Sequence, residues 1–217
     1  MMRSTTLPAQ DMWYAGKTFN YYYGGQYFAV FLTKLTGTNV EITYNLMRTM
    51  IAAFAFVLPF SLIRQMLKDR MKLKNHREWI AEAGGILAGI GVSMSGNLHY
   101  IIYGVILRLL KIREDYWFPD STRYIGFDPA VEGDETIHEF PSYSFVLGDL
   151  HAHVINVFLV LLVLGILYAW IKTNKEKSWK QKEIGVLGLL LGMFLFSNTW
   201  DFMIYYVVIC GTLFLEI

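Results

Sequence analysis

The stretch VINVFLVLLVLGILYAWI, residues 154–171, decides the fold of this chain. It is apolar almost throughout and carries no charged side chain. A bilayer core is crossed by about 20 mostly apolar residues in a helix, because a helix gives every backbone N–H and C=O a partner within its own segment. The stretch therefore predicts a membrane-spanning helix.

The composition is typical of a membrane protein. Hydrophobic residues make up 54% of the 217 residues and charged residues only 17%, whereas soluble domains have about 45–50% apolar and about 25% charged residues. The net charge of +1 does not indicate a nucleic-acid partner, so the partner we expect is the lipid bilayer. The single cysteine, Cys210, excludes a disulfide framework within the chain.

Further apolar segments lie on both sides of this stretch. We expect spans at about 44–67, 80–110, 142–171, 184–197 and 202–217, of which 80–110 is long enough to tilt, break or protrude. Residues 1–43 form an external segment with a short interfacial helix. The predicted fold is all-α: a polytopic transmembrane helix bundle in a single domain, 1–217. The start has no apolar signal region and the end lies within an apolar stretch, so we expect a fragment of a longer protein.

Lysine and arginine predict the orientation of the spans. The loop at 68–77 is rich in lysine and arginine and the loop at 172–182 is rich in lysine, so both should be cytoplasmic. The connection 111–141 is acidic and should lie outside, together with the N-terminal segment and the turn at 198–201. The predicted location is a cell membrane, crossed several times, with the polar motifs on the non-cytoplasmic side.

The motif GDLHAH, residues 148–153, gives the sharpest indication of a site. In a helix Asp149 and His153 share a face and His151 points away, whereas in an extended segment all three share a face. Either geometry can supply ligands for a divalent cation, or a general base with a carboxylate that orients it. The competing interpretation is a polar helix start, in which the helix dipole stabilises Asp149.

Other polar residues are predicted to reach the same side of the membrane. Ionisable groups at membrane depth cost at least about 2.5 kcal/mol near a helix centre, so they usually line a cavity or site. Ordinary roles stay open: a turn for Glu139, an aromatic belt for the tyrosines, a surface ion pair for Arg123 and a cap for Asn198. The further candidate site residues are Glu139, Asp11, Lys17, Asn20, Tyr21, Tyr22, Tyr23, Asn97, His99, Arg123, Asn198, Trp200 and Asp201.

Five segments in this order, 11–16, 20–23, 139–141, 148–153 and 198–201, closely resemble the YYY membrane protein family of prokaryotic polytopic proteins. That family is similar in layout to the GT-C superfamily of membrane glycosyltransferases. The resemblance implies a GT-C-like bundle with re-entrant or interfacial segments on the non-cytoplasmic face, and transfer of a sugar from a polyprenyl-phosphate donor. The chain lacks the family's acidic motif upstream of the Asp-x-Trp-Tyr segment, and it has Gly24 where the family more often has an aromatic residue.

Transfer with inversion needs a base for the acceptor hydroxyl and stabilisation of the departing phosphate. Asp11, Glu139 and Asp149 are the candidate bases, and the candidates for binding the phosphate are Arg123, Lys17, His153 or a bound divalent cation. The other candidates for substrate binding are Asn20, Tyr21, Tyr22, Tyr23, Asn97, His99, Asn198, Trp200 and Asp201.

A divalent cation, Mg²⁺ or Mn²⁺, is the cofactor that Asp149, His151 and His153 would bind. Two other classes of function stay open. Polar residues within the spans, such as Asn97 and His99, are compatible with a transporter or channel. The aromatic and glycine-rich faces are compatible with a non-catalytic membrane scaffold.

Overall fold

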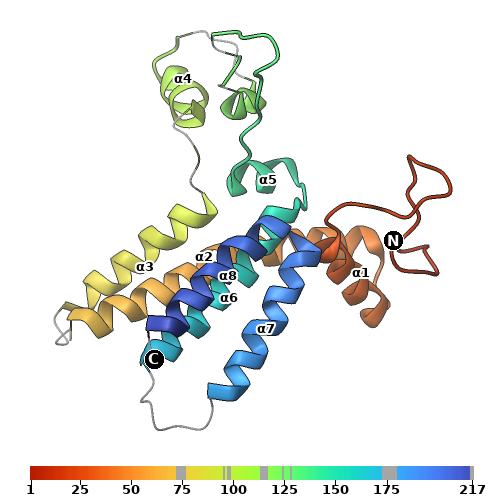
Figure 1. Cartoon of the computed structure of the whole chain (residues 1–217). Coiled ribbons are helices and arrows are strands. Elements are labelled where there is room, and N and C mark those ends of the chain that lie inside the picture. The colour runs from red at the N-terminus through yellow and green to blue at the C-terminus, as the bar shows by residue number, and fades with distance from the viewer. Residues whose placement is uncertain are drawn as a thin grey trace.

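The computed structural model describes residues 1–71, 77–94, 96, 99–112, 117–123, 125–127, 129–172 and 180–215 (Figure 1). Within these residues the chain is helical and has no strand, and its β-type pairs are the isolated bridges Gln10–Thr18 and Phe127–Ala130. The predicted all-α class is confirmed.

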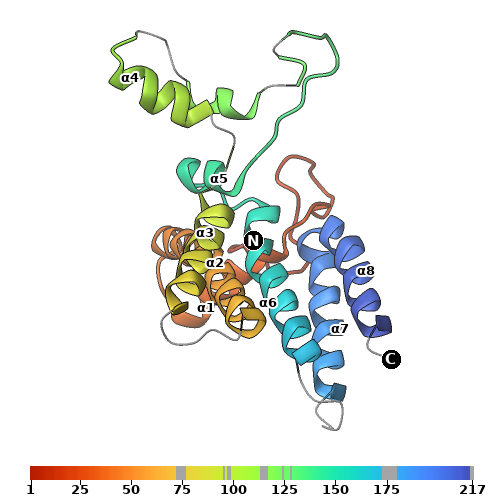
Figure 2. The ribbon, with the colours of Figure 1, turned by 90° about the vertical axis from the view of Figure 1, so that its left-hand side faces the viewer.

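Long helices that lie side by side form the body of the molecule (Figures 1 and 2). They are α2 (Val40–Met71), α3 (Glu78–Ser93), α6 (Ala152–Lys172), α7 (Lys180–Ser197) and α8 (Thr199–Leu215). In the described chain, α2 and α6 are long and apolar enough to cross a membrane, and α8 is a shorter apolar helix. These two helices contain the stretch at 154–171 and the predicted span at 44–67. We call the end of the bundle that holds the start of α6 the upper end, and the opposite end the lower end.

Helix α6 is central to the packing. One cluster of buried side chains joins its middle to α7 and α8 and includes Val163, Leu187 and Phe194. A second cluster joins its upper end to α2 and includes Ile51 and Val154. The start of α6, where the GDLHAH motif lies, is therefore anchored from both sides.

The outward faces of the bundle are apolar. Leu87 on α3, Leu189 on α7 and Val207 on α8 are exposed by 69%, 67% and 68%. Scattered exposed apolar residues are normal on soluble proteins, but large apolar side chains on several neighbouring helices form the extended apolar surface of a protein that contacts lipid or a partner.

Glycines allow α2 and α3 to pack closely. A Cβ atom added to Gly85 or Gly89 would lie 2.9 Å from the backbone oxygen of Phe60 or Phe56, respectively. Small residues at helix contacts let backbones approach, which is a common way for membrane helices to associate. These two positions explain why the glycine-rich sequence of α3 suits this place in the bundle.

The structure divides two of the predicted spans. The segment 80–110 is not one helix: α3 ends at Ser93, and a separate piece consists of η2 (Tyr100–Ile106) and α4 (Leu107–Leu109). Gly96 lies between the two pieces, and glycine is a poor helix former. The piece with α4 lies beyond the upper end of the bundle (Figures 1 and 2).

The segment 142–171 is also divided, into α5 (Pro141–Leu147) and α6. The division falls at Gly148, whose φ of +78° is the left-handed conformation that ends many helices and favours glycine. In the N-terminal region, α1 (Gly24–Thr36) matches the predicted short helix.

Candidate functional site

Three of the sequence-predicted residues come together at the junction of α5 and α6. Glu139 precedes α5, His151 precedes α6, and His153 is in the first turn of α6. Each offers one metal-ligand atom, and these three atoms lie within 4.8 Å of one another. The three side chains and Ile137 line an open cavity of about 380 Å³. This group, called here the His-Glu cluster, is the candidate site.

The backbone turn at Gly148 creates this arrangement. The N–H groups of Gly148 and Asp149 both donate to the carbonyl oxygen of Ser144, at 2.8 and 2.9 Å, which closes the end of α5. The N–H groups of Val154 and Ile155 then donate to the carbonyl oxygen of His151, which begins α6. The motif is therefore a short non-helical link between two helices. The link is therefore neither a regular helix nor a regular extended segment, which are the two geometries considered from the sequence. The contact between Asp149 and His151 nevertheless joins residues two positions apart, as expected for an extended segment.

Asp149 contacts His151 and lies outside the compact set of ligand atoms. Its Oδ2 atom lies 2.9 Å from Nδ1 of His151, and Oε2 of Glu139 lies 3.4 Å from the same nitrogen. The three potential ligand atoms within 4.8 Å of one another thus belong to Glu139, His151 and His153, whereas the sequence suggested Asp149, His151 and His153. A carboxylate that accepts the Nδ1 proton orients the imidazole and leaves Nε2 with the lone pair that binds a metal.

His153 contributes a nitrogen that suits a ligand. Its Nε2 atom is buried, and no hydrogen-bond partner for it exists among the described residues. A buried polar atom without a partner costs about 1–3 kcal/mol, and a bound cation or ligand would remove that cost. The electrostatic environment of this imidazole is set first by its burial and by the neighbouring His151, and then by the carboxylates of Glu139, Asp149 and Asp201.

Side chains of α1 and α2 hold the link in place. Nε2 of Gln26 donates to the carbonyl oxygen of Leu150 at 2.8 Å. The hydroxyl of Tyr44 donates to the carbonyl oxygen of Gly148 at 3.2 Å and accepts the N–H of Leu150 at 3.4 Å. The guanidinium of Arg48 donates to the carbonyl oxygen of Phe145 at 3.5 Å, near the end of α5. The polar backbone of the link is therefore satisfied from neighbouring helices.

The sequence analysis did not predict a role for Gln26, Tyr44 or Arg48, which support the link, or for Asn156 in α6. Arg48 is a cation within the predicted first span, and a charge at that depth is itself an indication of a site. Asn156 is a polar residue within the apolar stretch of α6 and is fully buried. Gln26 and Tyr44 carry no comparable signal, because polar and aromatic residues are ordinary at helix starts near a membrane boundary.

A polar network joins α6, α7 and α8 beside the cluster. Nδ2 of Asn156 donates to Oδ2 of Asp201 at 2.6 Å, and Nδ2 of Asn198 donates to the same oxygen at 3.0 Å. The hydroxyl of Ser197 donates to Oδ1 of Asn156 at 2.6 Å. Asn198 and Asp201, predicted to bind substrate, are therefore also structural partners at the α7–α8 junction. Trp200, between them, is 72% exposed.

The tyrosine triplet lines a different cavity. Asn20, Tyr21, Tyr22 and Tyr23 face Leu195, Phe196 and Thr199 of the α7–α8 junction across about 410 Å³. The ring centroids of Tyr23 and Phe196 are 4.8 Å apart, edge to face. This aromatic pocket has a mixed polar and apolar lining, which suits an amphipathic ligand such as a sugar.

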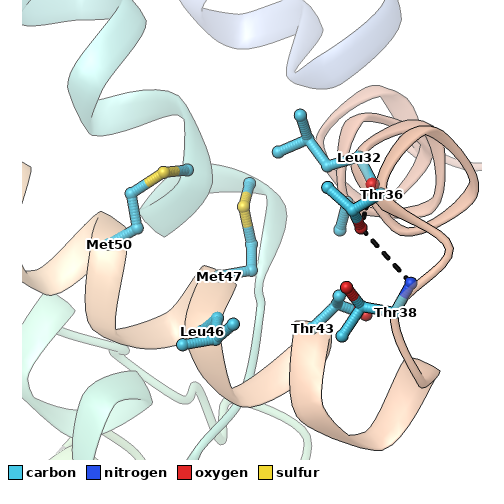
Figure 3. A pocket seen from close by; sticks show the side chains of 8 residues that line it. Leu32, Thr36, Thr38, Thr43, Leu46, Met47 and Met50 are labelled. Carbon is cyan, nitrogen blue, oxygen red and sulfur yellow. Dashed lines mark hydrogen bonds between the residues drawn. The ribbon is translucent and has the colours of Figure 1, made fainter.

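A third cavity is apolar and contains no titratable side chain. It lies between α1 and α2, has a volume of about 210 Å³, and is lined by methionine, leucine and threonine side chains (Figure 3). The N–H of Thr38 donates to Oγ1 of Thr36 at its edge, at 3.4 Å. It offers no group for acid–base or metal chemistry, so it is not the candidate site.

Four further predicted residues, Asp11, Lys17, His99 and Arg123, line neither the cavity of the His-Glu cluster nor the aromatic pocket. Asp11 caps a turn, where its Oδ1 accepts the N–H groups of Trp13 and Tyr14 at 2.7 and 3.1 Å. The other three are Lys17, whose carbonyl oxygen accepts the N–H of Asp11; Arg123, which stacks 4.7 Å above the ring of Trp117; and His99, which stacks on Tyr103 at 4.4 Å. Asn97, also predicted to bind substrate, lies outside the described residues.

Comparisons with known proteins give the family. The sequence model of a family described as uncharacterised membrane protein (DUF2298) matches residues 1–217. Searches of curated proteins and of solved structures each found no significant match. Because the family match spans the whole chain and agrees with its apolar helices, the chain belongs to the DUF2298 family of membrane proteins.

Proposed function

We propose that this protein is a membrane glycosyltransferase that moves a sugar from a polyprenyl-phosphate donor to an acceptor at the non-cytoplasmic face. The observation that carries the proposal is the His-Glu cluster: three ligand atoms within 4.8 Å of one another, at one end of an apolar helix bundle. A site at the boundary between lipid and water suits a substrate that has a lipid tail and a polar, charged head.

The donor set of the cluster fits a divalent cation. Imidazole and carboxylate together bind Mn²⁺ and Zn²⁺, whereas Mg²⁺ prefers oxygen ligands alone. Of the two cations expected from the sequence, Mn²⁺ is therefore the better candidate. A bound cation would supply positive charge to the donor phosphate, whose oxygens become more negative as the bond to the sugar breaks.

Asp149 is the preferred base. In the transfer, the acceptor oxygen bonds to the anomeric carbon, the bond from that carbon to the phosphate oxygen breaks with its electron pair, and the acceptor proton passes to a carboxylate. Glu139 is assigned to the cation, and Asp11 is committed to its turn. The Asp149 side chain is 51% exposed beside the cavity, and because only its Oδ2 atom contacts His151, its other oxygen can take a proton from a bound acceptor.

The aromatic pocket is the candidate site for the sugar or the acceptor. Aromatic rings bind the apolar faces of sugar rings, and amide groups such as that of Asn20 bind hydroxyls. The α7–α8 junction links the two regions, because Phe196 lines the pocket and Asp201 accepts a hydrogen bond from Asn156 of α6, which also carries His153.

The ligand set also supports a second reaction of the same substrate. Two histidines and one glutamate, with positions left for water, form the ligand set of catalytic zinc sites in hydrolases. In that case water would replace the acceptor hydroxyl, and the product would be the free sugar.

The test is product analysis with a radiolabelled polyprenyl-phosphate sugar and the purified protein in lipid vesicles, with Mn²⁺ or Zn²⁺. Transfer predicts label on an added saccharide or peptide acceptor, and hydrolysis predicts free labelled sugar. Glu139→Gln should abolish either product, while Lys34→Gln on α1 serves as a control outside the site. No product under any condition, from protein shown to be folded, would contradict both reactions.

A further inference from the structure

A second groove lies at the lower end of the bundle, between α2 and α6. Its volume is about 430 Å³, and it is lined by Ile63, Met66, Leu67, Arg70, Tyr168 and Lys172. The floor is apolar and aromatic, and the two cationic side chains belong to the last turns of their helices. The groove is remote from the His-Glu cluster, which lies at the upper end.

Two neighbouring cations of α2 are already paired with acids of α3. Arg64 lies 2.7 Å from Glu82, and Lys68 lies 3.9 Å from Glu78. Arg70, in contrast, is exposed and has no carboxylate within ion-pair distance among the described residues. One guanidinium at the mouth of an apolar groove is thus left to meet an external anion.

Lys172 is positioned by Asp69 and Tyr168, which also contact each other. Its Nζ lies 3.7 Å from Oδ2 of Asp69 and 5.8 Å above the ring of Tyr168. Asp69 additionally accepts hydrogen bonds from the Tyr168 hydroxyl at 2.5 Å and from Nε2 of Gln65 at 2.9 Å. Asp69 therefore has three partners, and Arg70, Lys172 and Asp69 together leave the mouth of the groove with one net positive charge.

We propose that this groove binds an anionic phospholipid, with the phosphate between Arg70 and Lys172 and an acyl chain over Ile63, Met66 and Leu67. Basic pockets between membrane helices are recognised sites for anionic headgroups, and a guanidinium can donate two parallel hydrogen bonds to phosphate oxygens. Met66 is 40% exposed, so the apolar floor continues to the outward surface of the bundle, where acyl chains lie. An amphiphile with one anionic head and an apolar tail matches this combination.

The test compares phosphatidylglycerol with phosphatidylcholine of the same acyl chains, added to the purified protein in detergent. Native mass spectrometry measures bound lipid, and thermal unfolding measures the stabilisation. The variant Arg70→Gln/Lys172→Gln should bind phosphatidylglycerol roughly thirtyfold more weakly, since each surface cation contributes about 1 kcal/mol. Lys34→Gln/Arg108→Gln, which removes two cations elsewhere, should bind it as the unchanged protein does.

A second variant tests the apolar part without touching the charges. Met66→Trp places a bulky ring in the groove and should weaken phosphatidylglycerol binding while the unfolding temperature without lipid stays close to that of the unchanged protein. Three results would overturn the proposal: equal binding of the two lipids by the unchanged protein, full binding by Arg70→Gln/Lys172→Gln, or the same stabilisation by inorganic phosphate alone.

Discussion

The carboxylate of Asp149 lies 2.9 Å from Nδ1 of His151, although the two residues are only two positions apart in the chain. The contact is possible because the chain leaves α5 at Gly148 and does not begin α6 until after His151. A carboxylate on one ring nitrogen fixes the orientation of the other, which is how many metal-binding histidines are held.

Replacing Asp149 with asparagine should weaken metal binding. The amide retains the size of the side chain but removes the charge that holds the imidazole, and losses of this kind typically cost about 10- to 100-fold in metal affinity. Isothermal titration of Mn²⁺ into the purified protein measures the change. Asp120→Asn, in η3 (Phe118–Thr122), is the matched control, because this residue does not line the cavity. Equal affinities for Asp149→Asn and the unchanged protein would remove Asp149 from this role.

Gly148→Ala should destabilise the link that carries the site. The residue has a φ of +78°, and an added Cβ would lie 2.5 Å from Cζ of Arg48. The left-handed conformation alone costs roughly 1–2 kcal/mol for a residue with a Cβ, which corresponds to a fall of roughly 2–8 °C in the unfolding temperature. Gly165→Ala in α6, where nothing lies within 4 Å of the added Cβ, should leave the temperature unchanged or raise it. Equal behaviour of the two variants would contradict the role given to Gly148.

Asn156→Leu should loosen the α6–α8 contact. The change removes the 2.6 Å hydrogen bond to Asp201 and leaves a half-buried carboxylate with fewer donors. A lost partner of this kind costs about 1–3 kcal/mol, seen as a lower unfolding temperature, and weaker Mn²⁺ binding should accompany it because Asn156 lies one helical turn after His153 in α6. The control is Thr212→Val in α8, whose hydroxyl bonds only to its own helix among the described contacts. If metal affinity is retained while stability falls, the network is structural and does not support the cluster.

Tyr21→Ala should affect substrate binding without affecting stability. The side chain lines the aromatic pocket and is 56% exposed, whereas the ring of Tyr23 packs against Phe196. A lost aromatic contact is worth about 0.5–1.5 kcal/mol, so the KM for sugar or acceptor should rise up to roughly tenfold with kcat nearly unchanged. Tyr23→Ala should instead lower the unfolding temperature. An unchanged KM in the Tyr21 variant would argue against a substrate in this pocket.

The apolar stretch at 154–171 and the polar motif before it carried most of what could be predicted. A long uncharged run of this kind is stable in lipid as a helix, and α6 is such a helix. The approach of Glu139 to His151 and His153 followed less directly, from the expectation that polar motifs gather at one face. The sequence could not predict that Glu139, and not Asp149, lies with His151 and His153 in the compact group of potential ligand atoms. This position depends on the turn at Gly148 and on Tyr44 and Arg48 of another helix.

Asp11 is a candidate base that the structure places outside the cavity of the His-Glu cluster. As an acidic residue in a motif it resembled a catalytic base, but its carboxylate accepts backbone N–H groups two and three residues further along the chain. Aspartate commonly makes such turns, and sequence alone does not distinguish a turn carboxylate from a catalytic one. Only the tertiary position separates Asp11 from the cavity that Glu139 lines.

The central claim is that Glu139, His151 and His153 bind one divalent cation. Electron paramagnetic resonance of Mn²⁺ added to the purified protein, with Glu139→Gln/His153→Gln and the control Lys34→Gln alongside, tests it most directly. We predict loss of the free-ion signal at one equivalent for the unchanged protein and for Lys34→Gln, and none for the double variant. A folded double variant that still binds one equivalent, or an unchanged protein that binds none, would contradict the claim.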